Sequence, residues 1–250
     1  MQLLNGDCLK LMKDIPDGSV DLILCDLPYG TTDCSWDSVL PFGELWEQYD
    51  RLLKPNGVAV LFAAQPFTTQ LISSNPKAFR YCWYWLKNIA TGFTYARYQP
   101  MRKVEDICVF YKQRPTYNPQ GLQVIENAKP KRKRNLPKGT SIYSMGTLAN
   151  EYTPRFKNWP KNVLEFNTER GYHPTQKPVP LLEYLIRTYT NEGDTILDNC
   201  MGSGSTGVAV QRVGGRHFIG IEQNKIYFDI ARERIEEATK WQTARSTSER

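Results

Sequence analysis

Short apolar runs alternate with helix-spaced segments in this chain, and this alternation constrains the fold more than any other feature. Residues 21–25 and 58–63 are apolar without polar alternation, which is typical of strands buried on both faces of a sheet. Between them, residues 42–53 place apolar side chains at helical spacing and stop at Lys54-Pro-Asn-Gly57. Strand, helix and strand in this order predict a βαβ unit, and therefore an α/β fold with a doubly wound, mostly parallel sheet.

The same pattern returns near the C-terminus after a long interruption. Further strands are expected at 81–85, 107–111, 195–199 and 218–221, and helices at 180–189, 205–213 and 224–239. Residues 112–162 are instead polar, irregular and rich in Pro, Asn, Lys and Arg. Because a structureless loop of this length is unusual inside a compact domain, we interpret it as an inserted functional segment. The expected catalytic domain is therefore 1–111 together with 163–250.

Composition excludes several classes of protein. No run approaches the length of a membrane span, and the first residues lack the pattern of a secretory signal, so we expect a cytoplasmic protein without membrane contact. The six cysteines include no CxxC pair, and His173 and His217 are the two histidines, so neither a metal site nor a histidine-dependent hydrolase is expected. The net charge of +6 permits an anionic partner without requiring one.

A glycine-rich segment follows the expected strand at 195–199. Gly202, Gly204 and Gly207 satisfy the GxGxxG spacing, and Glu222 ends the next strand, 24 positions after Asp198. This pattern indicates a tight turn, a close approach of backbone to a ligand, and a carboxylate that accepts ribose hydroxyl protons. The alternative is a glycine-rich turn that binds nothing.

The acid before this segment favours one kind of nucleoside. Dinucleotide enzymes place a pyrophosphate against the helix N-terminus, where the negative charge of Asp198 would repel it. S-adenosylmethionine carries an ammonium and a sulfonium and has no phosphate, so the residues favour it as the cofactor.

A second cluster, Asp26-Leu-Pro28-Tyr29-Gly30, directly follows the strand at 21–25. Asp26 and the carbonyls beside Pro28 would accept the N–H bonds of a nucleobase amine, and Tyr29 would stack on a base turned out of the double helix. The alternative is an ordinary Pro-Tyr-Gly turn capped by the aspartate. Asp26, Pro28 and Tyr29 are the candidate catalytic residues.

These motifs resemble those of the amino-group DNA methyltransferases. Residues 26–29 resemble their (Asn/Asp/Ser)-Pro-Pro-Tyr motif, with Leu27 where proline is usual, a departure that makes the turn less stiff. Residues 198–207 are similar to their S-adenosylmethionine motif. His173-Pro-Thr-Gln-Lys177-Pro resembles the segment that meets the methionine end of the cofactor, and Asn5-Gly-Asp7-Cys8 the segment near its adenine ring.

The order of these motifs resembles the circularly permuted β group of the family, over residues 1–111 and 163–240. The resemblance implies a Rossmann-like class I methyltransferase fold in which donor and acceptor meet where two central strands end side by side. Lys177 would then pair with the carboxylate of the cofactor. The cofactor-binding residues that we expect are Asp7, Cys8, Asp26, Thr175, Lys177, Asp198, Gly202, Ser203, Gly204, Thr206 and Glu222.

Adenine N6 of a flipped base in double-stranded DNA is the expected target, because serine at the position of Asp26 usually marks the cytosine-N4 enzymes. Cytosine-N4 methylation and a catalytically silent DNA-binding protein remain alternatives. RNA and protein-glutamine methyltransferases usually have the unpermuted order. The resemblance also implies a bacterial, archaeal or phage-encoded enzyme that can form a homodimer.

The densest basic run of the chain lies within the inserted segment. Lys131, Arg132, Lys133 and Arg134 follow one another there, and they are either DNA phosphate contacts or a solvated basic loop. Cys8, Cys34 and Cys200 lie near the motifs and are interpreted as small packing residues, since an exocyclic amine needs no cysteine nucleophile. Trp83 and Trp85 are expected in the core.

Overall fold

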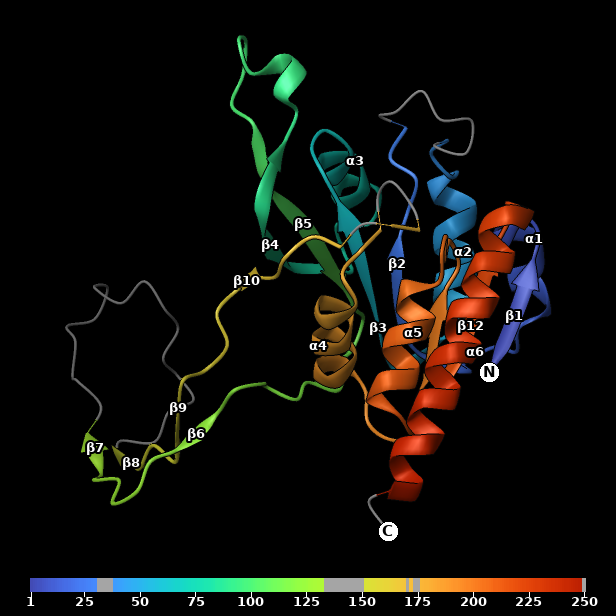
Figure 1. Ribbon diagram of the computed structural model, residues 1–250. Helices are drawn as coiled ribbons and strands as arrows, with labels where there is room; N and C mark the ends of the chain where they lie inside the picture. Colours follow the sequence, from blue (N-terminus) through green and yellow to red (C-terminus); the bar gives the residue numbers. More distant parts are fainter. Residues whose placement is uncertain (31–37, 133–150, 170, 173–175, 249–250) are drawn as a thin grey trace. The chain divides into compact units, whose positions relative to one another are not determined.

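The structure, a computed structural model, describes all residues except 31–37, 133–150, 170, 173–175 and 249–250, and leaves the side chains of 132 and 243–248 undescribed. The chain divides into two compact units, one formed by Met1–Asn118 with Asn162–Arg250 and the other by Pro119–Lys161. The larger unit contains an eight-stranded sheet in the order β1-β12-β11-β2-β3-β5-β4-β10 (Figure 1). Its strands are β1 (Gln2–Asn5), β2 (Val20–Asp26), β3 (Leu53–Ala63), β4 (Phe79–Thr91), β5 (Arg102–Phe110), β10 (Val163–Glu165), β11 (Thr195–Asp198) and β12 (His217–Glu222).

Only β5 runs against its neighbours in this sheet: it is antiparallel to β3 and to β4, and all other adjacent pairs are parallel. The mostly parallel α/β sheet expected from the sequence is therefore confirmed.

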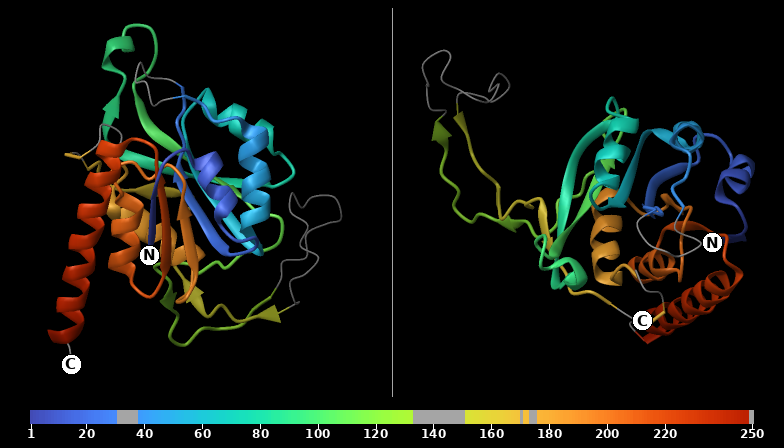
Figure 2. Two further views of the ribbon diagram at one scale, coloured as in Figure 1. Left: turned by 90° about the vertical axis from the view of Figure 1, so that its right-hand side faces the viewer. Right: turned by 90° about the horizontal axis from the view of Figure 1, so that it is seen from above.

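Helices cover both faces of the sheet (Figure 2). Successive side chains of β2 point to opposite faces, so Leu22 and Leu24 join one core and Ile23 and Cys25 the other. The first core is completed by α4 (Val179–Tyr189), α5 (Ser205–Val213) and α6 (Lys225–Ser248). The second is completed by α1 (Cys8–Leu11), α2 (Phe42–Leu52) and α3 (Phe67–Ser74). Because both faces are covered, the middle of each central strand is a continuous apolar run, as the sequence suggested.

The helices and strands expected from the sequence are all present in this unit, with ends that differ by a few residues or more. The structure adds β1, β10, α1 and α3, and continues α6 to Ser248, beyond the expected end at 239. It also extends β4 and β5 into a long hairpin. Trp83 and Trp85 are buried in the core, as expected.

The smaller unit contains two short antiparallel pairings in its described part. β6 (Gln123–Val124) pairs with β9 (Phe156–Lys157), and β7 (Lys131–Arg132) pairs with β8 (Glu151–Tyr152). Residues 112–118 belong to the larger unit, where the backbone N–H of Asn118 donates to the carbonyl of Thr188 over 2.7 Å.

Two strands at the centre of the sheet position the candidate site. β11 pairs in parallel with β2, through Ile196 opposite Leu22 and Leu197 opposite Ile23. Parallel neighbours end at the same edge of a sheet, so Asp26 and Asp198, the last residues of their strands, meet at one edge. The expected juxtaposition of the two motif strands is confirmed.

Candidate functional site

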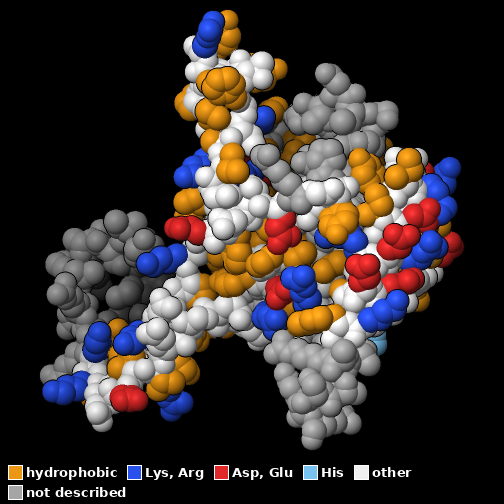
Figure 3. Space-filling model, in the orientation of Figure 1, with side chains coloured by type: hydrophobic (Ala, Val, Ile, Leu, Met, Phe, Trp, Pro, Cys, Tyr) orange, Lys and Arg blue, Asp and Glu red, His pale blue; other side chains and the backbone are white. Residues whose placement is uncertain are grey.

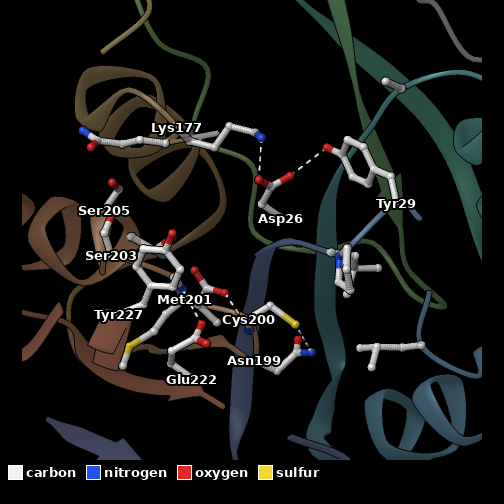
Figure 4. A pocket seen from close by; sticks show the side chains of 18 of the residues that line it. Asp26, Tyr29, Lys177, Asn199, Cys200, Met201, Ser203, Ser205, Glu222 and Tyr227 are labelled. Carbon is white, nitrogen blue, oxygen red and sulfur yellow. Dashed lines mark hydrogen bonds and ion pairs between the residues drawn. The ribbon is translucent and has the colours of Figure 1, made fainter. Parts of the chain in front are cut away.

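A cavity of about 860 Å³ opens at this edge of the sheet (Figure 4). Its lining includes Asp26 and Tyr29 of one motif together with Asp198, Gly202 and Glu222 of the other. Segments that lie far apart in the sequence therefore share one cavity, which is large enough for a nucleoside with a side chain and for a reacting base.

Glycine is needed at the three positions of the GxGxxG segment for different structural reasons. Gly204 has φ +80°, and a Cβ there would lie 2.8 Å from the Cβ of Ala231 in α6. At Gly207, a Cβ would lie 2.3 Å from the Cδ1 of Ile235. Around Gly202, which has φ +51° and lines the cavity, no heavy atom of the described residues would lie within 4 Å of a Cβ. The last two glycines thus allow close packing of α5 against α6, and the first leaves open space for a ligand.

Glu222 holds the glycine-rich loop to the end of β12. Its Oε2 accepts a hydrogen bond from the Gly202 N–H at 2.9 Å, and its Oε1 accepts one from the Asn224 N–H at 2.7 Å. Burial raises the pKa of Glu222, and the backbone donors oppose that rise. Since each carboxylate oxygen accepts about two hydrogen bonds, both oxygens retain capacity for a diol.

The opening segment of the chain lies against this end of β12. The side chain of Asn5 donates to the carbonyl of Glu222 at 2.7 Å, and the Gly6 N–H donates to the same carbonyl at 3.0 Å. Asp7 and Cys8 line the cavity. The carboxylate of Asp7 accepts from the Leu9 N–H and caps α1, which gives this acid a structural role as well.

Asp198 is a buried carboxyl group, 3% exposed, that lines the cavity. Burial raises the pKa of Asp198 to about 7, against hydrogen bonds from the Thr206 side chain and the Cys200 N–H. Ser203 and Thr206 are also buried, and the guanidinium of Arg234 bonds the hydroxyl of Ser203. A cationic ligand bound beside this buried carboxyl group would stabilise its ionised form.

Asp26 is held from two sides. The Tyr29 hydroxyl donates to its Oδ1 at 2.7 Å, and the Lys177 ammonium lies 2.5 Å from its Oδ2 (Figure 4). The ring of Tyr29 stacks on Phe67, with centroids 4.9 Å apart and planes 24° apart. Pro28 lines the cavity beside them. The three candidate catalytic residues therefore lie together, with the carboxylate and the aromatic ring braced in place.

Lys177 and Glu105 extend the contacts of Asp26 into a buried chain of charges. The Lys177 ammonium lies 3.0 Å from Oε1 of Glu105, whose other oxygen pairs with the ammonium of Lys87. Both Lys177 and Glu105 are under 10% exposed. Lys177, which the resemblance assigned to the cofactor carboxylate, thus binds two carboxylates of its own chain in this structure.

Burial and charge oppose each other within this cluster. For Asp26, burial raises the pKa, and the lowering by Lys177 does not outweigh it. Burial also raises the pKa of Glu105, but the ammonium groups of Lys177 and Lys87 prevail and hold it below its usual value. Burial lowers the pKa of Lys177, yet the carboxylates of Asp26 and Glu105 raise it overall. Lys177 is therefore a permanent cation between two carboxyl groups.

Sequence reasoning missed Glu105 and Lys87. Glu105 lies in β5 opposite Trp85, in a stretch that continues as a buried apolar strand. A carboxylate at the start of such a strand is a signal that a partner cation lies nearby. The identity of the partner depends on the sheet order, which this signal does not contain.

Other expected residues belong to the smaller unit or lie outside the described part of the chain. Lys131 and the backbone of Arg132 belong to β7 in the smaller unit, while Lys133, Arg134, Thr175, His173 and Cys34 are outside the described residues.

Two of the cysteines near the motifs lie beside Asn199, whose side-chain amide is 3.8 Å from the thiol of Cys8 and 3.5 Å from the thiol of Cys200. Hydrogen bonds of the neighbouring thiols, together with burial, hold the pKa of Cys8 and of Cys200 above the usual value, so these thiols are neutral packing groups.

The described residues contain no group of three or more His, Cys, Asp or Glu side chains arranged to hold a metal ion. No helix among them is both long and apolar enough to cross a membrane.

Comparison with known proteins identifies the family of this chain. The profile of the N6/N4 DNA methylase family matches residues 20–233. The chain belongs to this family. The type II methyltransferase M.HpaI of Haemophilus parainfluenzae is 30% identical over 256 residues, which cover 94% of this chain and 74% of that protein. M2.DpnII of Streptococcus pneumoniae is 58% identical over 66 residues, 26% of this chain and 24% of the relative.

Solved structures of other proteins have the same fold. A complex of M1.HpyAVI with SAM superposes with a TM-score of 0.62 and 25% identity, covering 94% of this chain and 98% of that one. The cytosine-N4-specific PvuII DNA methyltransferase has a TM-score of 0.66, with 96% and 90% covered, but its 17% identity supports the fold alone. This chain is therefore an S-adenosylmethionine-dependent DNA methyltransferase with the Rossmann-like class I fold.

Proposed function

We propose that this methyltransferase methylates N6 of adenine, in a base that it flips out of double-stranded DNA. The observation that carries the proposal is the position of Asp26: a carboxylate, braced by Tyr29, at the end of the strand beside the one that ends in Asp198. An exocyclic amine is a weak nucleophile because its lone pair is delocalised into the ring. A fixed carboxylate that accepts hydrogen bonds from the N–H groups of the amine returns electron density to the nitrogen.

The residues of the cavity fit S-adenosylmethionine, which when bound supplies a methyl group on a cationic sulfur. Glu222 would accept the two ribose hydroxyls, Asp198 would face the positively charged end, and Gly202 would leave room for close approach of the backbone. The rest of the proposed binding set is Asp7, Cys8, Asp26, Thr175, Lys177, Ser203, Gly204 and Thr206.

In this proposal Asp26 and the carbonyls beside Pro28 would accept hydrogen bonds from the amine. The nitrogen would take the methyl group as the methyl–sulfur bond breaks and the sulfur leaves as a neutral thioether, and Asp26 would accept the proton that the amine loses. Tyr29, held on one face by Phe67, would offer its other face to the flipped base. Lys177 orients Asp26 and, against the effect of burial, lowers its pKa, which favours the ionised form that accepts a proton as the nitrogen becomes cationic.

We further propose that the smaller unit, Pro119–Lys161, contributes to target recognition. Its run Lys131, Arg132, Lys133 and Arg134 would contact phosphates. Changing all four to alanine should reduce the slope of log affinity against log salt by about 3, at every DNA sequence. Parallel salt lines for the variant and the wild type would contradict the phosphate contacts.

The motif order of this chain, with Asp26 ahead of Asp198, supports membership of the circularly permuted β group. A homodimer and a role in a bacterial, archaeal or phage-infected cytoplasm belong to the same proposal. Sedimentation velocity with and without DNA tests the dimer, and a sedimentation coefficient of a single chain in both would contradict it.

The decisive experiment is incubation of the purified chain with S-adenosylmethionine and DNA, followed by base-resolution mapping of the methylated positions. N6-methyladenine is expected, and N4-methylcytosine would overturn the adenine assignment. Asp26→Ala should abolish transfer while cofactor binding stays within a few-fold, since a charge-assisted hydrogen bond made in the transition state affects rate above all. DNA binding without any methylation by the wild type would indicate a silent DNA-binding protein.

A further inference from the structure

The hairpin formed by β4 and β5 ends in a tip whose aromatic side chains face solvent (Figure 1). The two strands pair as far as Thr91 opposite Arg102, and the turn between them contains a short 3-10 helix, Phe93–Tyr95. Phe93 is 81% exposed and Tyr98 is 86% exposed. The space-filling view shows orange apolar groups and a blue basic group at this tip (Figure 3). Neither ring is buried in the core, so core packing does not explain why aromatic residues occupy these two positions.

All of the charged residues in the stretch that contains the hairpin tip are basic. Between Asp50 and Glu105 the sequence contains no acidic residue, whereas it contains Arg51, Lys54, Lys77, Arg80, Lys87, Arg97, Arg102 and Lys103. Arg97 lies in the tip, and Arg102 and Lys103 begin the returning strand, all three exposed. An exposed surface that combines aromatic rings with unopposed positive charge complements nucleic acid, because phosphates meet the cations and bases stack on the rings.

The stem of the hairpin is also a wall of the catalytic cavity. Ile89 and Thr91 of β4, with Arg102 and Val104 of β5, line the same cavity as Asp26. The exposed tip is therefore joined, through the stem of the same hairpin, to the cavity in which a flipped base would react. A protein partner would also fit exposed aromatic rings, but the absence of acids and this continuity with the cavity favour DNA.

We propose that the hairpin tip binds the DNA duplex beside the target base, and that Phe93 and Tyr98 occupy the stack from which that base is extruded. Arg97 contacts a phosphate of the same duplex. This inference rests on the proposed function, and it adds the element that stabilises the opened duplex. Extrusion breaks pairing and stacking, and an aromatic ring inserted into the gap restores part of the lost stacking.

The test compares two substrates in single-turnover methyl transfer by the full chain. One is the intact duplex, and the other is the same duplex with an abasic site opposite the target base, which lowers the work of extrusion. The double variant Phe93→Ala, Tyr98→Ala should transfer methyl to the intact duplex at least about tenfold more slowly, and to the abasic duplex within about threefold of the wild-type rate. Arg97→Ala should reduce the salt slope of binding by about 0.9.

Matched controls come from α6, where Ile226 is 71% exposed and Trp241 is 54% exposed, and neither lines the catalytic cavity. Ile226→Ala, Trp241→Ala should match the wild type on both substrates. Calorimetric titration with S-adenosylmethionine should give the wild-type affinity for both double variants, which shows that the fold is intact.

Equal rates for the wild type and the tip variant on the intact duplex would overturn the inference. A loss of the same size on both substrates would also overturn it, and a change of oligomeric state with that loss would mark the tip as a protein interface instead. If the wild type itself transfers no methyl group to either duplex, the proposed function fails, an outcome distinct from the failure of the hairpin.

Discussion

Replacing Lys177 by methionine should destabilise the folded chain strongly and make its stability fall with rising pH. The ammonium lies 2.5 Å from Oδ2 of Asp26 and 3.0 Å from Oε1 of Glu105. With an effective dielectric constant of about 20, these two contacts correspond to attractions of about 7 and about 6 kcal/mol. The loss of solvation of each buried ion offsets much of this, so the expected net loss is about 3–5 kcal/mol at pH 7.5.

The pH dependence follows from the two carboxyl groups left behind. Without the lysine, burial holds the pKa of Asp26 further above the value of about 4 in the unfolded chain, and Glu105 loses one of the two ammonium groups that lower its pKa. Over the pH range between the unfolded and the raised folded pKa values, the folded state then binds more protons, so stability declines as pH rises through that range. The stability difference between wild type and variant should therefore be larger at pH 7.5 than at pH 5.

Urea unfolding followed by tryptophan fluorescence measures both effects, through the midpoint at constant m-value. Lys54→Met is the matched control, because Lys54 pairs with Asp21 at 2.7 Å but is 38% exposed, and its loss should lower stability by about 1 kcal/mol or less. Adding Glu105→Gln to Lys177→Met should restore part of the loss. A Lys177→Met variant within about 1 kcal/mol of wild type at both pH values would refute the reasoning.

Four further substitutions separate the roles of residues on the cofactor side of the cavity. Glu222→Ala should weaken S-adenosylmethionine binding by roughly tens-fold in calorimetric titration without DNA, since two hydroxyl contacts are lost, and an unchanged dissociation constant would leave Glu222 as an anchor of the loop alone. Because burial raises the pKa of Asp198 to about 7 and a cation binds its ionised form, cofactor affinity should increase about five- to tenfold from pH 6 to pH 7.5. Asp198→Asn should remove that slope, and persistence of the slope would assign it to another group. Gly204→Ala should lower the free energy of unfolding by about 2–4 kcal/mol, from the left-handed backbone and the contact with Ala231. Gly202→Ala, with open space around the added methyl, should lose only about 1 kcal/mol, and equal losses in urea melts would contradict the packing argument.

Local signals in the sequence were sufficient for most of the sheet and for the position of both motifs. The apolar run at 21–25 and the helical spacing at 42–53 became β2 and α2 because periodicity and stop signals act over a few residues. Shorter or more polar elements, such as β1 and α3, lacked that signal. The inserted segment was visible as a change in composition, which contains no information on the pairings β6 with β9 and β7 with β8.

The expected meeting of Asp26 and Asp198 also held, because a parallel sheet aligns the ends of neighbouring strands. The adjacency itself was inferred from motif order and the rules of doubly wound sheets. No periodicity contains that information, and the side-chain roles at the edge remain predictions for the experiments above.

By itself, the sequence determined the alternation of strands and helices, the glycine-rich loop and the two carboxylates, since each depends on residues close together in the chain. Only the tertiary structure decided which charges face one another. Lys177 reaches Asp26 across 151 positions, and Glu105 joins them because β5 lies two strands from β2 in the sheet. The exposure of Phe93 and Tyr98 was decided in the same way, because an aromatic side chain is buried or exposed according to what the rest of the fold packs against it.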